Sequence, residues 1–304
     1  MRPTESSGML ELADFRELSK TLRSEVDDAL VATTEYGPDV PTHLAEAIRH
    51  SLLAPAKRLR PLLVLIACEA CGYDRSKAMP AAVAVELIHT YSLIHDDLPA
   101  MDDDDMRRGR PSCHAKFGES TGILAGDALL AQAFEVLAAD HLPGPVVAKC
   151  VKELAVAAGA ANLVGGQHDD LGAEFADLGL ASLEAIHRRK TGAMICVSLR
   201  LGAIIAGASS EVLTALSQYG ERLGLAFQIV DDLLDLEGDQ QLMGKRVGKD
   251  SEAGKLTYPK LLGAEASRQR AEMLVAEAIA SVSRDDLSSG ALIALARYVL
   301  ERKH

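Results

Sequence analysis

Residues 212–235 read VLTALSQYGERLGLAFQIVDDLLD, and this stretch predicts the class of the fold. Its large apolar residues recur in steps of three and four, which is the spacing that places side chains on one face of an α-helix. They are Val212, Leu216, Tyr219, Leu223, Ala226, Val230 and Leu233. We therefore expect one long helix that packs this stripe into a core, with Gln228, Asp231 and Asp235 on roughly the opposite side.

The two carboxylates of that opposite side predict a cation. Asp231 and Asp235 are four residues apart, so they share one helical face, where like charges repel. Phe227, Leu234 and Leu236 make that face apolar as well, and we expect the carboxylates to point into the interior. A buried carboxylate without a cation costs several kcal/mol and tends to take up a proton.

A second acidic cluster lies in HDDLPAMDDDDMRRG at residues 95–109. It carries Asp96, Asp97, Asp102, Asp103, Asp104 and Asp105, followed by Arg107 and Arg108. Acidic runs are usually solvated surface, but both clusters adjoin strongly apolar helices. Hard oxygen ligands in this number suit Mg²⁺, which binds through one or two carboxylates plus substrate phosphates. Calcium is disfavoured, because neither stretch has the ligand spacing and central Gly of a calcium loop.

The rest of the chain favours an all-α fold. Hydrophobic residues make up 48% of the 304 positions, aromatic residues only 4%, and alternating β-branched runs are rare. Proline and glycine breaks predict helices over 9–35, 43–53, Pro61 to Gly72 and Pro80 to about His95, and helices that resume near Thr121, Val146, Ser182 and Glu211. Residues 99–111 are expected to be a loop, and no strand pairs are expected. We predict one helical bundle over residues 1–304, with 1–8 as a candidate disordered end.

Charge and cysteine content exclude several classes of protein. A formal charge of −12 disfavours nucleic-acid partners and anionic membrane surfaces. No apolar run approaches the ~20 residues that span a bilayer, and no signal-peptide pattern is found, so we expect a cytoplasmic protein without stable membrane insertion. Cys68 and Cys71 lack further zinc ligands nearby, and the five cysteines are expected to be packed and free of disulfides.

Basic and polar residues beside the helix breaks complement the aspartates. They are Lys57, Arg60, His89, Arg107, Arg108, Lys190, Thr191, Lys245, Lys249 and Lys255. His89 lies two helical turns, ~10 Å, before Asp96 on the same face. Taken singly, such a histidine is more often packed in a helix and each lysine more often solvated. Together they favour a site for two diphosphate groups.

Five motifs in order carry a resemblance to a known family. KRLRP, the first aspartate motif, KTG, GLAFQIVDDLLD and GKDSEAGKLTYP run from Lys57 to Tyr258. The chain closely resembles the trans-prenyltransferases, or polyprenyl synthetases, and among them the bacterial farnesyl diphosphate synthases. The resemblance implies an isoprenoid synthase bundle around a deep central cavity, homodimerisation and three Mg²⁺ ions, for which Mn²⁺ could substitute. The implied reaction condenses isopentenyl diphosphate with dimethylallyl or geranyl diphosphate.

The resemblance also assigns roles to residues. Matches to the magnesium ligands are Asp96, Asp102 and Asp231, with Asp97 and Asp235 nearby. Matches to positions that bind isopentenyl diphosphate are Lys57, Arg60, His89 and Arg108. Matches on the allylic side are Arg107, Lys190, Thr191, Gln228 and Lys245. Of these, Lys190, Thr191 and Gln228 would stabilise the allylic carbocation, and the released diphosphate is the expected base.

Product length is expected to depend on what blocks the tunnel below the first motif. Tyr91 and Ser92 stand five and four residues before Asp96, and the larger ring is the candidate floor. Tyr91 and the Pro99-Ala100 insertion resemble farnesyl synthases, which predicts a fifteen-carbon product. Alternatively, Tyr91 is an ordinary core aromatic residue.

Three other functions stay open. They are a geranylgeranyl diphosphate synthase, a terpene cyclase and a non-catalytic partner subunit. Cyclases generally lack the set of Lys57, Arg60 and His89, and partner subunits usually lose one aspartate motif. The sequence assigns no role to His168 and Asp169, which replace the more usual apolar residues after GGQ.

Overall fold

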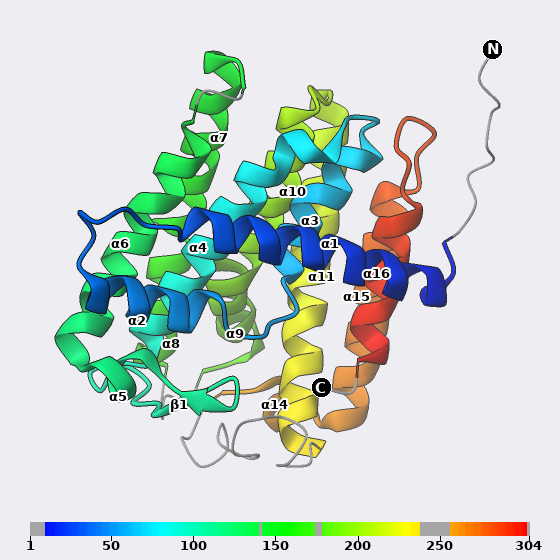
Figure 1. The fold of residues 1–304 in the computed structure, drawn as a ribbon. Coiled ribbons are helices and arrows are strands. Elements are labelled where there is room, and N and C mark those ends of the chain that lie inside the picture. Colours follow the sequence, from blue (N-terminus) through cyan, green and yellow to red (C-terminus); the bar gives the residue numbers. More distant parts are fainter. Residues whose placement is uncertain (1–9, 140–141, 174–177, 238–255, 303–304) are drawn as a thin grey trace.

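The computed structural model describes residues 10–139, 142–173, 178–237 and 256–302, and these residues are predominantly helical (Figure 1). The helices before the first aspartate motif and the one that carries it are α1 Leu12–Thr33, α2 Thr42–Leu52, α3 Leu59–Ala70, the 3₁₀ turn η1 Arg75–Ala78 and α4 Met79–Asp96. Those that follow are α5 Cys113–Phe117, α6 Glu119–Leu137, α7 Gly144–Ala158, α8 Leu163–Gly172, α9 Leu180–His187, the π-helical turn η2 Arg188–Gly192, α10 Ala193–Ile205, α11 Ser210–Glu237, α14 Tyr258–Leu262, α15 Ala264–Val282 and α16 Gly290–Glu301. The predicted all-α class is confirmed.

The core is built around α3, α4, α10 and α11 (Figure 1). Helices α3 and α10 are apolar nearly all round, as expected of helices enclosed by others. Their backbones touch at Gly202, where an added Cβ would collide with the carbonyl oxygen of Val64 and stand 2.9 Å from the nitrogen of Cys68. No helix among the described residues is long and apolar enough to cross a membrane.

The apolar stripe predicted on α11 is confirmed. All seven of its residues are buried, none more than 7% exposed. The phenol of Tyr219 donates a hydrogen bond of 2.7 Å to the carbonyl of Leu292 on α16, so the one polar atom of the stripe is satisfied. Helix α15 packs along α11 (Figure 1). This packing fixes the rotation of α11, and with it the direction of its aspartates.

The first aspartate motif runs into a short hairpin, and here the prediction of no strand pairs is wrong. Strand β1, Met106–Arg107, pairs antiparallel with β2, Arg110–Pro111. The turn between them, Arg108 and Gly109, has φ angles of 53° and 74°. Positive φ at both central residues is the geometry of a type I′ turn, whose twist matches that of the strands. Two residues per strand are too few for an alternating pattern, so the sequence carried no strand signal.

Candidate active site

Helix α4 ends in the first aspartate motif, and the chain then folds back onto the helix end. The amide of Asp102 donates to the carbonyl of Asp96 at 2.8 Å, and that of Asp104 donates to the carbonyl of Asp97 at 3.1 Å. Burial raises the pKa of the Asp96 carboxyl to about 6, the charge of Lys190 lowers it, and Asp102 raises it. The fold therefore places two predicted ligands, Asp96 and Asp102, beside one another in a site where a cation would be stabilised.

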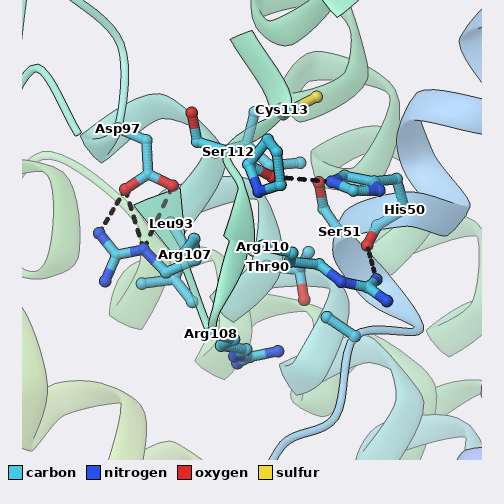
Figure 2. A pocket seen from close by; sticks show the side chains of 13 residues that line it. His50, Ser51, Thr90, Leu93, Asp97, Arg107, Arg108, Arg110, Ser112 and Cys113 are labelled. Carbon is cyan, nitrogen blue, oxygen red and sulfur yellow. Dashed lines mark hydrogen bonds and ion pairs between the residues drawn. The ribbon is translucent and has the colours of Figure 1, made fainter. Parts of the chain in front are cut away.

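Asp97 and Arg107 are bound to each other (Figure 2). Asp97 is only 2% exposed, and it accepts from Arg107 Nε at 2.9 and 3.2 Å and also from Nη2. Arg107 also lies 3.6 Å from Asp104. The sequence placed Asp97 near the metal and Arg107 on the allylic substrate. In the structure the carboxylate orients the guanidinium, and both assigned roles stay predictions.

A small pocket behind the hairpin shares these residues without being large enough for a substrate. Its volume is about 20 Å³, and Figure 2 shows Thr90, Asp97, Arg107 and Arg108 around it. That space suits about one water molecule. The hydroxyl of Thr90 is buried there without a hydrogen-bond partner among the described residues, so the pocket matches a structural water.

The second aspartate motif lies at the C-terminal end of α11, and its exposure differs from the prediction. Asp232 is buried and accepts a hydrogen bond of 2.9 Å from the amide of Tyr258, which anchors the start of α14. The side chain of Asp231 is 47% exposed, so it is less enclosed than the sequence predicted. Asp235, one turn further, is partly buried. The sequence gave Asp232 no role, because its partner, the amide of Tyr258, lies 26 residues away.

Asp231 is held by the end of the chain. Arg302, just after α16, donates to Asp231 Oδ1 at 2.7 Å and to the carbonyl of Phe227 at 2.8 Å, and its guanidinium lies 3.8 Å from the centre of the Phe227 ring. No sequence motif pointed to Arg302. Lys57 lies in the same neighbourhood: partial burial and the charge of Arg302 lower its pKa, whereas Asp231 raises it.

The π-helical turn η2 carries two of the three predicted carbocation-stabilising residues, and the third, Gln228, lies on α11. Thr191 donates from its hydroxyl to Gln228 Oε1 on α11 at 3.2 Å. Lys190 Nζ donates to Asp170 Oδ2 on α8 at 2.6 Å and lies 4.0 Å from Asp96 Oδ2 on α4. π-turns are frequent at functional sites. The turn thus connects α4, α8 and α11 through one lysine and one threonine.

Asp170 was missed by sequence reasoning, although a signal for it existed. It stands four residues after Gly166 in GGQHDDL, which is one turn of α8, so both face η2. Its neighbour Asp169 forms an ion pair with Arg189, and His168 is exposed on a surface pocket beside them. The sequence assigned no role to Asp169, and the ion pair with Arg189 provides a structural one.

Two guanidinium groups, of Arg60 on α3 and of Arg108 in the hairpin turn, lie close to His89 on α4. Burial strongly lowers the pKa of His89, and the guanidinium charges of Arg60 and Arg108 lower it further. Arg60 Nε is buried and has no hydrogen-bond partner among the described residues. Burial also lowers the pKa of Arg108. Two guanidinium charges beside an imidazole with a lowered pKa, all three partly buried, match an anionic ligand.

Arg58, between Lys57 and Arg60, has a structural place instead. It caps α3 in a left-handed conformation with φ 52°, and it donates to Glu86 Oε1 and to Asp27 Oδ1, each at 2.8 Å. The side chains of Arg58 and Glu86 are each 2% exposed. This pair anchors the KRLRP loop to α4 and α1.

The predicted chain-length residues lie on α4 as expected. Burial raises the pKa of Tyr91 to about 12, and the charge of Asp96 adds to the rise. The Tyr91 ring packs edge-on against His95, with centroids 5.7 Å apart. Ser92 uses its hydroxyl to donate to the carbonyl of His89 at 2.9 Å. Tyr91 is therefore both a core residue and a neighbour of Asp96.

The donor set fits a hard divalent cation. No three His, Cys, Asp or Glu side chains within the described ranges are already gathered around a common point. Asp96 and Asp102 offer the oxygen ligands that Mg²⁺ takes together with waters and substrate phosphates. Burial raises the pKa of Asp96, and a bound cation would offset that effect. Lys245, Lys249 and Lys255 lie outside the described residues.

The chain is similar to known proteins over most of its length. Residues 41–290 match the family model described as polyprenyl synthetase. The chain is 44% identical over 296 residues to farnesyl diphosphate synthase of Escherichia coli (strain K12), covering 95% of this chain and 99% of that protein. It is 49% identical over 272 residues to the heterodimeric geranylgeranyl pyrophosphate synthase large subunit 1, chloroplastic, of Arabidopsis thaliana, covering 87% and 73%.

A solved structure extends the similarity to the fold. Geranylgeranyl pyrophosphate synthetase from Pyrococcus horikoshii Ot3 aligns with a TM-score of 0.86 at 31% identity, covering 95% of this chain and 99% of that one. The overlap runs through both aspartate motifs and the basic cluster.

Proposed function

Because this chain belongs to the polyprenyl synthetase family, we propose that it condenses isopentenyl diphosphate with dimethylallyl and then geranyl diphosphate to give farnesyl diphosphate. The fold is the isoprenoid synthase helical bundle, and the enzyme is a prenyltransferase that elongates prenyl chains. The finer assignments that follow, of metal, residues and product length, are our proposal.

The observation that carries the proposal is the separation between carboxylates and guanidinium groups around α4. On one side Asp96 and Asp102 provide carboxylates, and around His89, two turns earlier on α4, the guanidinium groups of Arg60 and Arg108 provide positive charge. Two diphosphates can then be bound in different ways. One is held directly by cationic side chains, and the other lies between the aspartate motifs, where magnesium is needed to neutralise repulsion.

This difference explains why only one diphosphate leaves. Mg²⁺, when bound at Asp96, Asp102 and Asp231, supplies Lewis-acid neutralisation of the allylic diphosphate. Lys190 adds an ammonium on the same side, so negative charge that develops on the leaving oxygen is stabilised there. Isopentenyl diphosphate, held by Arg60, His89 and Arg108, keeps its diphosphate.

The reaction then follows from electron flow between the two substrates. The allylic carbon-oxygen bond breaks, its electron pair stays on the departing diphosphate, and the double bond of isopentenyl diphosphate forms a new carbon-carbon bond to the allylic cation. A proton is lost to the released diphosphate, which restores a double bond. The Thr191 hydroxyl and Gln228 amide oxygen, 3.2 Å apart, would direct negative dipole ends towards the cation.

Product length is the finer part of the proposal. Tyr91 is a large ring less than two turns before Asp96, which supports a tunnel closed at fifteen carbons. A second candidate, geranylgeranyl diphosphate synthesis, is favoured by the named activity of the Arabidopsis relative. Retention of both aspartate motifs argues against a non-catalytic subunit. Homodimerisation and cytoplasmic location stay predictions.

The test is product identification. The purified protein is incubated with isopentenyl diphosphate, labelled dimethylallyl diphosphate and Mg²⁺, and the products are dephosphorylated and chromatographed. We expect a fifteen-carbon alcohol, and none when Mg²⁺ is chelated. No alcohol longer than the primer would reject the synthase assignment, whereas a twenty-carbon alcohol would reject only the length.

A further inference from the structure

Lys190 lies between the carboxylates of Asp96 and Asp170. No sequence motif assigned a role to Asp170. We propose that Asp170 is a positioning residue: it holds the Lys190 ammonium away from Asp96, so that Asp96 can bind a divalent cation while the ammonium faces the leaving diphosphate. The inference rests on the proposed function, because it concerns the same metal and diphosphate.

The first support is the contact between backbones. A Cβ added to Gly166 on α8 would collide with the backbone nitrogen of Lys190 and stand 2.7 Å from its Cα. Helix α8 and turn η2 are therefore in direct contact, and the position of one determines that of the other. Asp170 follows Gly166 by one turn on the same face, which brings its carboxylate to the Lys190 side chain.

The second support is the pair of distances. Lys190 Nζ is 2.6 Å from Asp170 and 4.0 Å from Asp96, so it is hydrogen-bonded to the first carboxylate and only close to the second. All three side chains are at least three-quarters buried. A small rotation of the flexible lysine would bond it to Asp96. Loss of the Asp170 charge favours that rotation, and a lysine bonded to Asp96 competes with a cation.

Two simpler explanations must be separated from this one. Asp170 could only join α8 to η2, or it could itself bind the metal. The chain offers a matched control for the first, since Asp169 joins the same two elements through Arg189. Lys190 offers the control for the second, because a ligand role for Asp170 would not depend on the lysine.

The experiment measures Mn²⁺ binding by equilibrium dialysis at a fixed concentration of inorganic pyrophosphate. We expect Asp170→Asn to weaken Mn²⁺ binding by about tenfold, and Asp169→Asn to leave it within twofold of wild type. In a Lys190→Met background, Asp170→Asn should have no further effect. Asp170→Glu, which keeps the charge, should restore most of the binding and serves as the folded variant if Asp170→Asn is unstable.

The outcomes separate the inference from the proposed function. If the wild type binds Mn²⁺ and Asp170→Asn behaves like Asp169→Asn, the inference alone is overturned. A loss that persists in the Lys190→Met background would make Asp170 a ligand and also overturn it. If the wild type binds no Mn²⁺, the metal-dependent function fails and the inference with it. As a second readout, Asp170→Asn should lower kcat while leaving KM for isopentenyl diphosphate within about threefold, since that diphosphate is held elsewhere.

Discussion

Two arginines of the KRLRP motif should respond differently to replacement by methionine. Arg58→Met should lower the free energy of unfolding, and Arg60→Met should weaken the binding of isopentenyl diphosphate. Arg58 donates to Glu86, Asp27 and the carbonyls of Leu52 and Ala54, at 2.8 to 3.2 Å. Its removal leaves the Glu86 carboxylate buried and without its cation. Breaking such a buried pair costs about 3 to 5 kcal/mol, whereas the half-exposed Asp27 contributes at most about 1 kcal/mol.

Arg60 should behave in the opposite way. Its Nε is buried without a hydrogen-bond partner among the described residues, so methionine removes an ill-compensated cation. We expect the free energy of unfolding to change by less than about 1 kcal/mol. Loss of a charged hydrogen bond to a phosphate, worth about 1.5 to 3 kcal/mol, should raise KM for isopentenyl diphosphate by about tenfold to a hundredfold.

Urea unfolding followed by circular dichroism measures the first quantity, and initial rates at varied isopentenyl diphosphate measure the second. Asp27→Asn is the control for the exposed part of the Arg58 network and should cost little. Equal destabilisation by Arg58→Met and Arg60→Met, or an unchanged KM in Arg60→Met, would refute the division of roles drawn from the contacts.

Three further predictions follow from the structure. Tyr91→Ala should lengthen the product by five carbons or more, because the ring that closes the proposed tunnel is removed; an unchanged product places the floor elsewhere. Burial lowers the pKa of His187 to about 4, against the opposing charge of Asp170. Below about pH 6.5 the unfolded chain therefore binds a proton that the folded chain does not, so the free energy of unfolding should fall as the pH drops from 6.5 to 4, and His187→Phe should remove that part of the dependence in urea titrations. Gly166→Ala should force α8 off η2 and lower activity more than tenfold with a lower melting temperature, whereas Gly172→Ala on the same helix, with open space around it, should behave as wild type.

Local patterns determined much of what the sequence predicted correctly. The stripe on α11 is a property of spacing along one helix, so it could be derived without knowing what the helix packs against. Proline and glycine breaks act on their own backbone, which is why α2 and α4 begin within one residue of the predicted starts at 43 and Pro80. The order of the charged motifs was likewise sufficient for the family.

Only the tertiary structure decided which side chains and backbone groups contact each other. The sequence assigned Asp231 to the metal and gave Asp232 no role, and the fold shows that Asp232 accepts a hydrogen bond from the amide of Tyr258 while Asp231 is bound by Arg302, 71 residues away. It gave Asp170 no role, and packing of α8 on η2 set it beside Lys190. Spacing along a helix fixes which face a side chain occupies, but what meets that face depends on elements distant in the chain. The sequence therefore predicted which chemical groups the site contains, and only the fold determined which of these groups contact each other.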